Sequence, residues 1–465
     1  LDVLTVRSRF DDPDMWWHLK TGEIIWKTRS IPTSDIFSYT TNHHSWIPHE
    51  WLSQVLIYAA YQMNGYSGMM IWLCVLTAAL LITGYALCSL YSGNAKVGWA
   101  GALILWFFST SGLAIRPQMI GYLLLAIELV LLHLGATRNP RWFFWLPPLF
   151  GVWVNCHGSF FLGFLVGAAV FFCSLFEFQM GSLISHRWNS RRRKLLMVAL
   201  IVSAAALFFN PIGIRQVLYP LNAMFQQPLN IGVVEEWKPL VVSSGRGIGL
   251  MGVLGAIFLM VLIRKSQLFW HELVLLAAGT WLAVSHQRMV FVFGILAAPV
   301  LSRMLAPFWE GFDSAQDLPL ANAGMMALSI LTVYLAFPSR TNIQRQIAEN
   351  SPVQAVAFLE SHHLAGNMLN DYRDGGYLIW AAPEHPVFID GRAEIYEWAG
   401  VLRKYGQWAL LESNPETLLD TYRVNFCLLD RNSPMARILP LLPGWQTVYS
   451  DDLSVIFERR TPNPS

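Results

Sequence analysis

Charged side chains are scarce in this sequence. Of its 465 residues only 13% are Asp, Glu, Lys or Arg, about half the share found in an ordinary soluble domain. The shortage lies in residues 67–338, which hold long apolar runs, whereas residues 1–50 and 339–465 read as soluble protein. The formal net charge is only +2 and no basic stripe with interleaved aromatic residues occurs. We therefore expect no nucleic-acid partner.

Cysteine is also scarce, and its spacing excludes two kinds of site. Of the five cysteines four, Cys74, Cys88, Cys156 and Cys173, fall inside apolar runs, and no pair has metal-ligand or redox spacing. We expect no disulfide framework. Residues 1–10 lack the charged region and cleavage site of a signal peptide. If a further transmembrane helix precedes them in the gene, it is not in this chain.

The apolar runs predict about ten transmembrane helices, because a helix needs roughly 20 apolar residues to cross the hydrocarbon core. The 20 Trp and 28 Phe suit such a protein, since aromatic rings gather at membrane interfaces. The 142–156 range is short and contains Pro147 and Pro148, which neighbouring helices can accommodate. The predicted spans are 67–90, 97–114, 117–135, 142–156, 158–178, 194–210, 247–264, 269–286, 289–306 and 321–338.

Lys and Arg in the short loops predict the orientation, because cytoplasmic loops are enriched in them. If the N-terminal segment lies outside, the short outside turns carry only Arg116 and Arg288. Residues 1–66 then form an external loop with amphipathic helices, 67–338 the membrane domain, and 339–465 an external α/β domain. The inside loops carry Lys96, Arg138, Arg141, Arg187, Arg191, Arg192, Arg193, Lys194, Arg264, Lys265 and Arg303.

Two acidic segments occur in the predicted external loop. Asp12 and Asp14 flank Pro13 and precede His18, and such a pair suits a divalent metal or a general base. The alternative is a solvated turn that caps the next helix. His49 and Glu50 stand just before an amphipathic stretch, where simple capping is again the alternative. The segment 32–35, which ends at Asp35, also reads as a turn with helix-cap chemistry.

The other polar candidates lie at the predicted outer ends of the spans. Arg116 precedes Gln118 between two spans; its planar fork suits phosphate, and snorkelling to the interface is the alternative. Asn155 and His157 have a similar depth, where a structural role is the alternative. The 211–246 loop carries a pair of acids, and Arg288 follows the second span after it. All these residues face one compartment, so we expect Asp12, Asp14, His49, Glu50, Arg116, Glu235 and Arg288 to line one cavity.

The C-terminal region predicts a small α/β domain. Short β-branched and aromatic runs in 370–380 and 387–392 read as strands between turns, and 352–364 and 415–422 read as helices. The Asp-Gly pairs at 374–375 and 390–391 are typical of tight turns. The predicted core comprises Phe358, Leu359, Leu378, Ile379, Val387, Phe388, Phe426 and Leu428.

This layout resembles the GT-C class of membrane glycosyltransferases, which draw sugars from polyprenyl-phosphate carriers outside the cytoplasm. It is most similar to the catalytic subunit of oligosaccharyltransferase. That family has an acidic motif in its first external loop, which Asp12–Pro13–Asp14 resembles, and a Glu in a long external loop before four spans, as at Val234–Glu235–Glu236. A phosphate-contacting Arg of that family matches Arg288 in position.

The chain also departs from that family. Its Trp-Trp-Asp-Tyr-Gly motif has only a loose counterpart at 372–377, without the tryptophan pair, so peptide-acceptor recognition is not carried over. A second acidic pair of the family has no counterpart here. The segments Asp-Pro-Asp-Met-Trp-Trp-His-Leu and His-Glu-Trp-Leu are similar to those of uncharacterised bacterial membrane proteins distantly related to GT-C enzymes.

The resemblance implies a glycosyltransferase of a bacterial inner membrane that moves a sugar from a polyprenyl-phosphate-type donor to an acceptor on the outer face. The alternative is a non-catalytic subunit of a larger membrane complex, with other membrane subunits as partners. A transporter is disfavoured because few charges sit deep in the spans, Glu128 and Glu177 being the exceptions. A divalent metal, Mg or Mn, is an expected cofactor, with Asp12, Asp14 and Glu235 as ligands. The expected catalytic residues are Asp12, Asp14 and Glu50, and the expected substrate-binding residues are His18, His49, Arg116, Gln118, Asn155, His157, Glu235, Glu236, Arg288 and Asp374.

Overall fold

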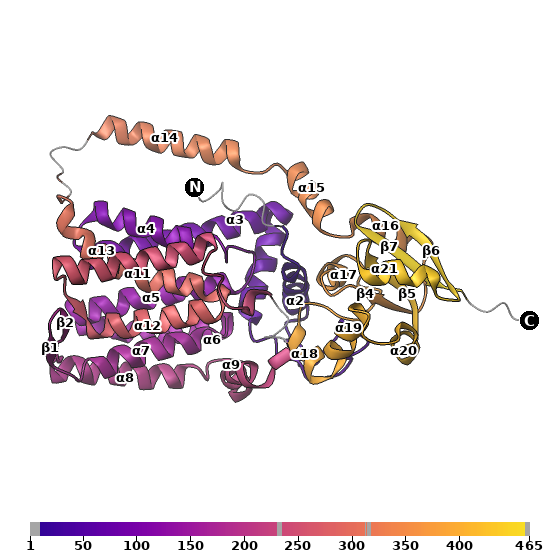
Figure 1. The fold of residues 1–465 in the computed structure, drawn as a ribbon, viewed down its shortest axis with the longest axis horizontal. Helices are drawn as coiled ribbons and strands as arrows, with labels where there is room; N and C mark the ends of the chain where they lie inside the picture. The colour runs from indigo at the N-terminus through magenta and orange to yellow at the C-terminus, as the bar shows by residue number, and fades with distance from the viewer. Residues whose placement is uncertain (1–9, 230–234, 312, 314–317, 461–465) are drawn as a thin grey trace, which may run out of the picture.

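A computed structural model describes residues 10–229, 235–311, 313 and 318–460 of the chain, apart from the side chains of Gln226 and Glu235. A bundle of apolar helices occupies one end of an elongated molecule, and a smaller α/β domain occupies the other (Figure 1). Helix α2 (Asp14–Thr28) lies between them, packed against both α3 (Trp51–Ser92) and α17 (Gly375–Ala381). The residues of the first loop therefore stand at the junction of the two parts.

Each of the ten predicted spans contains a helix. Five of these helices, α3, α5, α11, α13 with its flanking turns, and α14, are long and apolar enough to cross a membrane. The helices that lie in the ten predicted spans are α3 (Trp51–Ser92), α4 (Ala95–Ser109), α5 (Gln118–Thr137), α6 (Leu146–Cys156), α7 (Phe160–Cys173), α8 (Ser190–Ala206), α11 (Gly245–Arg264), α12 (Trp270–Ser285), α13 (Val290–Leu305) and α14 (Pro319–Ala336).

Two predicted spans are wrong in their extent. The 142–156 range is a 3-10 turn (Pro140–Trp145) followed by α6, which has 11 residues and so is only about 16 Å long. The 158–178 range ends early, because α7 stops at Cys173 and β1 (Phe178–Met180) begins at its last residue. Strand β1 pairs with β2 (Leu183–Ser185), and β2 pairs with β3 (Leu268–Phe269) in a small sheet at the end of the bundle away from the α/β domain.

Helix α3 changes direction between its polar and apolar parts. Asn64 and Gly65 leave the helical conformation, and Gly65 has φ +58°, which costs little only for a residue without a Cβ atom. The segment before the kink is the amphipathic stretch predicted from Leu52 to Tyr61, and the segment after it is the first predicted span. Helix α14 differs from the other membrane helices because it buries none of its residues within the described structure.

The C-terminal part is a four-stranded sheet with helices around it. The strand order is β4-β5-β7-β6, with β4 and β5 parallel and the other pairs antiparallel. Its strands are β4 (Asn367–Asn370), β5 (Val424–Asp430), β6 (Trp445–Ser450) and β7 (Ser454–Arg459). Its helices are α15 (Arg340–Asn350), α16 (Val353–His362), α17 (Gly375–Ala381), α18 (Ala393–Trp398), α19 (Val401–Ala409), α20 (Pro415–Thr421) and α21 (Pro434–Ile438).

The sequence prediction for this part is partly confirmed. The two predicted helices occur as α16 and α20, and the predicted core residues are buried except Phe358, which is half-buried. The predicted strand at 370–380 is wrong beyond Asn370, because Gly375–Ala381 forms helix α17. Segment 387–392 is also not a strand; Val387 forms an isolated bridge with Ser38 of the first loop. The two apolar runs therefore pack against the first loop instead of extending the sheet.

A buried ion pair joins the first loop to the C-terminal domain. Arg392 is fully buried and donates to Asp35 Oδ1 at 2.7 Å and to both carboxylate oxygens of Asp390 at 2.8 and 2.6 Å. Its guanidinium also lies over the rings of Phe37 and Trp46. The prediction that Asp35 caps a helix is wrong. Its carboxylate accepts hydrogen bonds from Arg392 and from the backbone N–H groups of Phe37 and Ser38.

Candidate active site

Arg116 is the centre of a cluster of carboxylates between the bundle and the C-terminal domain. It lies in the turn before α5, and its Nη2 atom is 2.9 Å from Asp14 Oδ2. Its Nε atom contacts Asp12 Oδ2, and Nη1 donates to both oxygens of Glu236 at 3.2 and 3.3 Å. Its side chain is only 14% exposed. Arg116 therefore pairs with three carboxylates, whereas the alternative hypothesis was that its side chain only snorkels to the membrane interface.

Arg288 stands beside this cluster and shares one of its acids. Its Nη2 atom donates to Gln118 Oε1 at 2.7 Å, and its Nη1 atom lies 3.7 Å from Glu236 Oε2. The guanidinium lies over the Trp237 ring, 4.6 Å from its centroid. The Trp237 carbonyl in turn lies 2.8 Å from His286 Nδ1. Glu236 therefore stands between two guanidinium groups that come from different helix junctions.

A second cluster surrounds Glu50, which is the residue before α3. Its Oε1 atom lies 3.3 Å from His157 Nε2 and 3.5 Å from His49 Nε2, and its Oε2 atom lies 3.8 Å from His18 Nε2. Glu50 stands at the N-cap position but its side chain makes no capping hydrogen bond. The capping alternative is therefore wrong for Glu50. His18 is close enough to Arg116 and Asp12 to interact electrostatically with both, so the two clusters adjoin.

Burial and neighbouring charges shift the pKa values of these groups in different directions. Burial raises the pKa of Asp14 to about 7 against the opposing effect of Arg116, and Asp12 and Glu236 raise it further. Burial also tends to raise the pKa of Glu50, but the three histidines hold it well below its usual range. Burial lowers the pKa of His18 to about 3 and that of His157 to about 4. Asp14 is thus the acid suited to exchange a proton near neutral pH.

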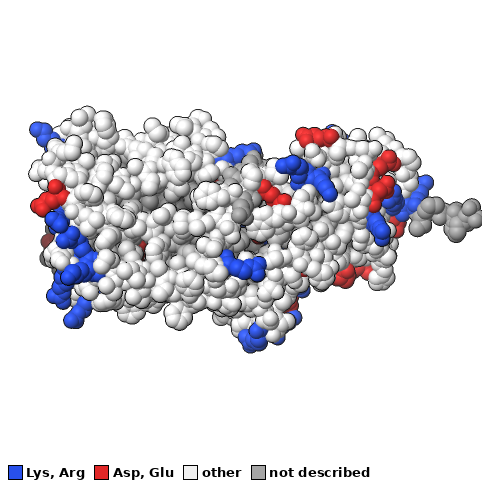
Figure 2. All heavy atoms as spheres, turned by 90° about the horizontal axis from the view of Figure 1, so that it is seen from below, with Lys and Arg blue, Asp and Glu red and all other residues white. Residues whose placement is uncertain are grey.

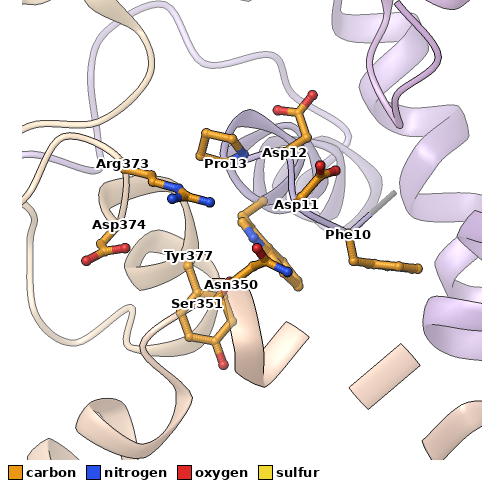
Figure 3. Close-up of a pocket in the computed structure, with 10 residues that line it drawn as sticks. Phe10, Asp11, Asp12, Pro13, Asn350, Ser351, Arg373, Asp374 and Tyr377 are labelled. Atoms are coloured by element: carbon orange, nitrogen blue, oxygen red, sulfur yellow. The ribbon is translucent and has the colours of Figure 1, made fainter. Parts of the chain in front are cut away.

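Asn155 and Asp374 lie at the edges of this arrangement. Asn155 accepts a hydrogen bond from the Trp51 indole at 2.8 Å and donates to the carbonyls of Gly151 and Phe209, so its amide braces three segments. Asp374 lines a pocket with Asp11 and Asp12 between the start of α2 and the C-terminal domain (Figure 3). That pocket has a volume of about 10 Å³, room for about one water molecule.

The metal prediction does not fit the arrangement that the structure shows. Asp12 and Asp14, two of the expected ligands, both contact the Arg116 guanidinium. The side chain of Glu235 lies outside the described structure; only its place at the start of a 3-10 turn (Glu235–Trp237) is described. Among the described residues, no group of three or more His, Cys, Asp or Glu side chains is arranged to hold a metal ion. We derive no step through a metal.

Two polar residues next to the site escaped prediction. Tyr219 of α9 (Ile214–Gln226) stacks on His49 with ring centroids 3.7 Å apart. Glu394 of α18 hydrogen-bonds to Tyr219 and interacts electrostatically with His49. These segments are distant in sequence and carry no recognisable motif, so no signal in one sequence connects them.

Glycines of the C-terminal domain allow it to approach the acidic motif closely. A Cβ atom on Gly376 would lie 2.3 Å from the Pro13 carbonyl oxygen, and one on Gly391 would lie 1.8 Å from Asp14 Oδ1. Either contact is too short for real atoms. The Asp390–Gly391 pair that was interpreted as a tight turn is therefore also a point where the last domain touches Asp14, and Gly376, directly after the Asp374–Gly375 pair, is where it touches Pro13.

This fold is that of the GT-C membrane glycosyltransferases, although no family model and no curated protein matches the sequence. One similar structure is the oligosaccharyltransferase of Archaeoglobus fulgidus with a tethered acceptor peptide, with a TM-score of 0.56 and 12% identity. The match covers 91% of this chain and 65% of that one, so the chain spans about two thirds of its length.

Two further GT-C enzymes match over nearly the whole chain. ArnT from Cupriavidus metallidurans bound to undecaprenyl phosphate has a TM-score of 0.52 at 10% identity, and the match covers 98% of this chain and 95% of ArnT. The arabinofuranosyltransferase AftD from mycobacteria has a TM-score of 0.52 at 11% identity, and the match covers 100% of this chain and 41% of AftD. At such identities the likeness defines the fold, and the helices make this a membrane-embedded protein.

Proposed function

We propose that this protein is a glycosyltransferase that moves a sugar from a polyprenyl-phosphate-type donor to an acceptor on the outer face of a bacterial inner membrane. The observation that carries the proposal is the placement of Arg116 and Arg288 on either side of Glu236, beside Asp12 and Asp14. Two guanidinium groups that share one carboxylate are spaced to share a phosphate group, which also accepts bidentate hydrogen bonds from arginine.

The proposed chemistry follows from where charge develops. Departure of the lipid phosphate leaves negative charge, which Arg116 and Arg288 stabilise from fixed positions. Asp14, whose pKa is raised by burial, accepts the proton of the acceptor hydroxyl. Asp12 orients Asp14, because its Oδ1 atom accepts a hydrogen bond from the Asp14 backbone N–H at 3.0 Å. Glu50 stays ionised and positions His49 and His157, which together with His18 face the acceptor.

Similar structures give this proposal its donor class. The Archaeoglobus fulgidus enzyme AglB, which matches with a TM-score of 0.54, was solved in complex with an inhibitory peptide and a dolichol-phosphate, and ArnT was solved with undecaprenyl phosphate. A non-catalytic subunit built on the same scaffold has no particular observation in its favour. The proposed sidedness is supported by the loop charges, which predict that residues 1–66 and 339–465 lie outside the cytoplasm.

The test is retention and affinity of a lipid carrier. Protein purified from membranes should carry polyprenyl phosphate, detected by mass spectrometry of extracted lipid. Arg288→Lys keeps the charge but loses the bidentate fork, so the carrier affinity should fall by about tenfold or more, on the order of 1.5–3 kcal/mol for a charged hydrogen bond. The matched control is Arg345→Lys on exposed α15, where lysine should substitute freely. Equal carrier affinity in wild type and Arg288→Lys would remove Arg288 from the site.

A further inference from the structure

A second cavity lies at the opposite end of the bundle, beneath the small β1-β2-β3 sheet. Its volume is about 190 Å³, room for several water molecules. It is partly open, and it is lined by the ends of α3, α5 and α7, by β2 and β3, by the first turns of α12, and by the end of α13. None of its lining residues belongs to the proposed active site, so the cavity is a separate feature.

Nitrogen-bearing side chains converge on this cavity from four elements. His133 comes from α5, His186 follows β2, His271 comes from α12, and Arg303 comes from α13. The His133 ring contacts that of Tyr91 at a tilt of 31°, with ring centroids 4.3 Å apart, and His133 interacts electrostatically with His271. His186 is exposed at the rim.

The single carboxylate of the cavity is already neutralised. Glu272 accepts from Arg303 Nε at 2.9 Å and from Arg303 Nη2 at 2.5 Å, and it also caps α12 at the Phe269 backbone N–H. Since this acid is paired, no free carboxylate lines the cavity, and the histidines give it a donor-rich wall. The floor is apolar, with Leu129, Leu132, Val170 and Leu275 buried or half-buried.

Positive charge surrounds this end of the molecule. Figure 2 shows Lys and Arg, together with fewer Asp and Glu, gathered at the end of the bundle away from the C-terminal domain, next to a wide uncharged band on the same face. Exposed basic residues occur in the loops after α5, β2 and α11 and in the adjoining turns of α8 and α11. They include Arg138, Arg187, Arg191, Lys194, Arg264 and Lys265, all of which are exposed.

We propose that this cavity binds the phosphate of an anionic membrane lipid from the leaflet opposite the active site, with His133, His186, His271 and the Arg303 guanidinium as its polar wall. An apolar floor with donors on one wall and a basic rim matches a phosphate attached to hydrocarbon. A volume below the roughly 300 Å³ of a drug-sized pocket admits the headgroup and the first carbons, while the chains stay in the bilayer. The basic rim attracts anionic lipid from the surrounding surface.

The test uses short-chain dihexanoyl phosphatidic acid, with dihexanoyl glycerol and inorganic phosphate as the separate parts of that ligand. Binding to the full chain in detergent is measured by calorimetry in an Arg288→Lys background, which weakens the outer site. We expect phosphatidic acid to bind at least tenfold more tightly than either inorganic phosphate or the uncharged lipid. If inorganic phosphate binds as tightly, the site takes free phosphate and the lipid proposal is overturned.

The variants locate the binding. His186→Ala removes an exposed rim donor and should fold normally, and Ala136→Phe fills the cavity without removing any donor. Each should weaken phosphatidic acid binding by about tenfold, whereas His44→Ala, an exposed histidine of the first loop, should not change it. Unchanged affinity in His186→Ala together with Ala136→Phe would overturn the proposal. Loss of binding in His44→Ala would overturn it as well.

Discussion

Glu236 lies between Arg116 and Arg288, 3.2 Å from Nη1 of the first and 3.7 Å from Nη1 of the second. Its side chain is 43% exposed, more than either arginine. Breaking the ion pairs of such an exposed carboxylate costs little free energy. In the proposed function, Glu236 holds the two arginines together until a lipid phosphate takes its place.

This arrangement predicts that Glu236→Gln binds the lipid carrier more tightly than wild type. Removing the competing charge frees both guanidinium groups, and exposed ion pairs are worth about 0.2–1 kcal/mol each. We expect a rise of about two- to fivefold in affinity for polyprenyl phosphate, measured by titration. Asp420→Asn, which breaks an exposed pair with Arg459, is the control. A weaker Glu236→Gln complex would instead make Glu236 a direct ligand of donor or acceptor.

The raised pKa of Asp14 predicts a pH-dependent rate. A general base must be unprotonated to accept a proton, so kcat/KM should rise with pH through an apparent pKa of about 7. That value belongs to the cluster of Asp14 with Asp12, Glu236 and Arg116. The pH profile of sugar transfer measures it, and Asp14→Asn should abolish the rise together with most of the activity. A profile that stays flat between about pH 5.5 and 8.5 would exclude Asp14 as the base.

The buried pair of Asp35 and Arg392 predicts a large loss of stability when one partner is removed. Asp35→Asn leaves a buried guanidinium under-compensated, a change that typically costs about 3–5 kcal/mol. Thermal unfolding should show the drop, and Asp420→Asn at the surface should shift unfolding by less than about 1 kcal/mol. Similar unfolding temperatures for the two variants would contradict the structural role of the pair.

The same pair sets an acid limit on stability. Despite burial, Arg392, Ser38 and Thr41 lower the pKa of Asp35 below its usual value. Because the folded pKa is depressed, the stabilisation is present above the unfolded pKa of about 3.9 and is lost as pH falls through the lower folded pKa. Unfolding temperature should therefore fall more steeply below about pH 4 in wild type than in Asp35→Asn.

Glu128 predicts a substitution that the protein tolerates. It is fully buried in α5, and both carboxylate oxygens lack a hydrogen-bond partner in the described structure. An unpaired charge at such a place costs several kcal/mol, so Glu128→Gln should unfold at the same or a higher temperature and keep its activity. Loss of activity with unchanged folding would show that the carboxylate has a function of its own.

The orientation predicts which side of the membrane reaches the C-terminal domain. In sealed inner-membrane vesicles of known sidedness, protease on the cytoplasmic face should leave residues 339–465 intact, and protease on the other face should cut them. Immunoblotting of an epitope in this domain reads the result. Cleavage from the cytoplasmic face would reverse the assignment and place the basic end of the bundle outside.

The sequence predicted most of the helical architecture because long apolar runs have few alternatives. It failed where tertiary contacts decide local structure. Tyr377, Leu378 and Ile379 read as strand by composition, yet Gly375 and Gly376 pack tightly against other backbone and the segment becomes helix α17. The pairing of Tyr219 with Glu394, and of Asp35 with Arg392, joins segments far apart in the chain. A single sequence records no such pairing.

The contact of Gly376 and Gly391 with Pro13 and Asp14 has a consequence for synthesis. The acidic motif leaves the ribosome well before Gly376 and Gly391, which support it. At a synthesis rate of about 5–20 residues per second, the wait is on the order of 20–75 seconds. Until then the motif lacks the surface that Gly376 and Gly391 provide, so a chain stalled before these residues contains α2 and α3 but not the contact that fixes Asp14.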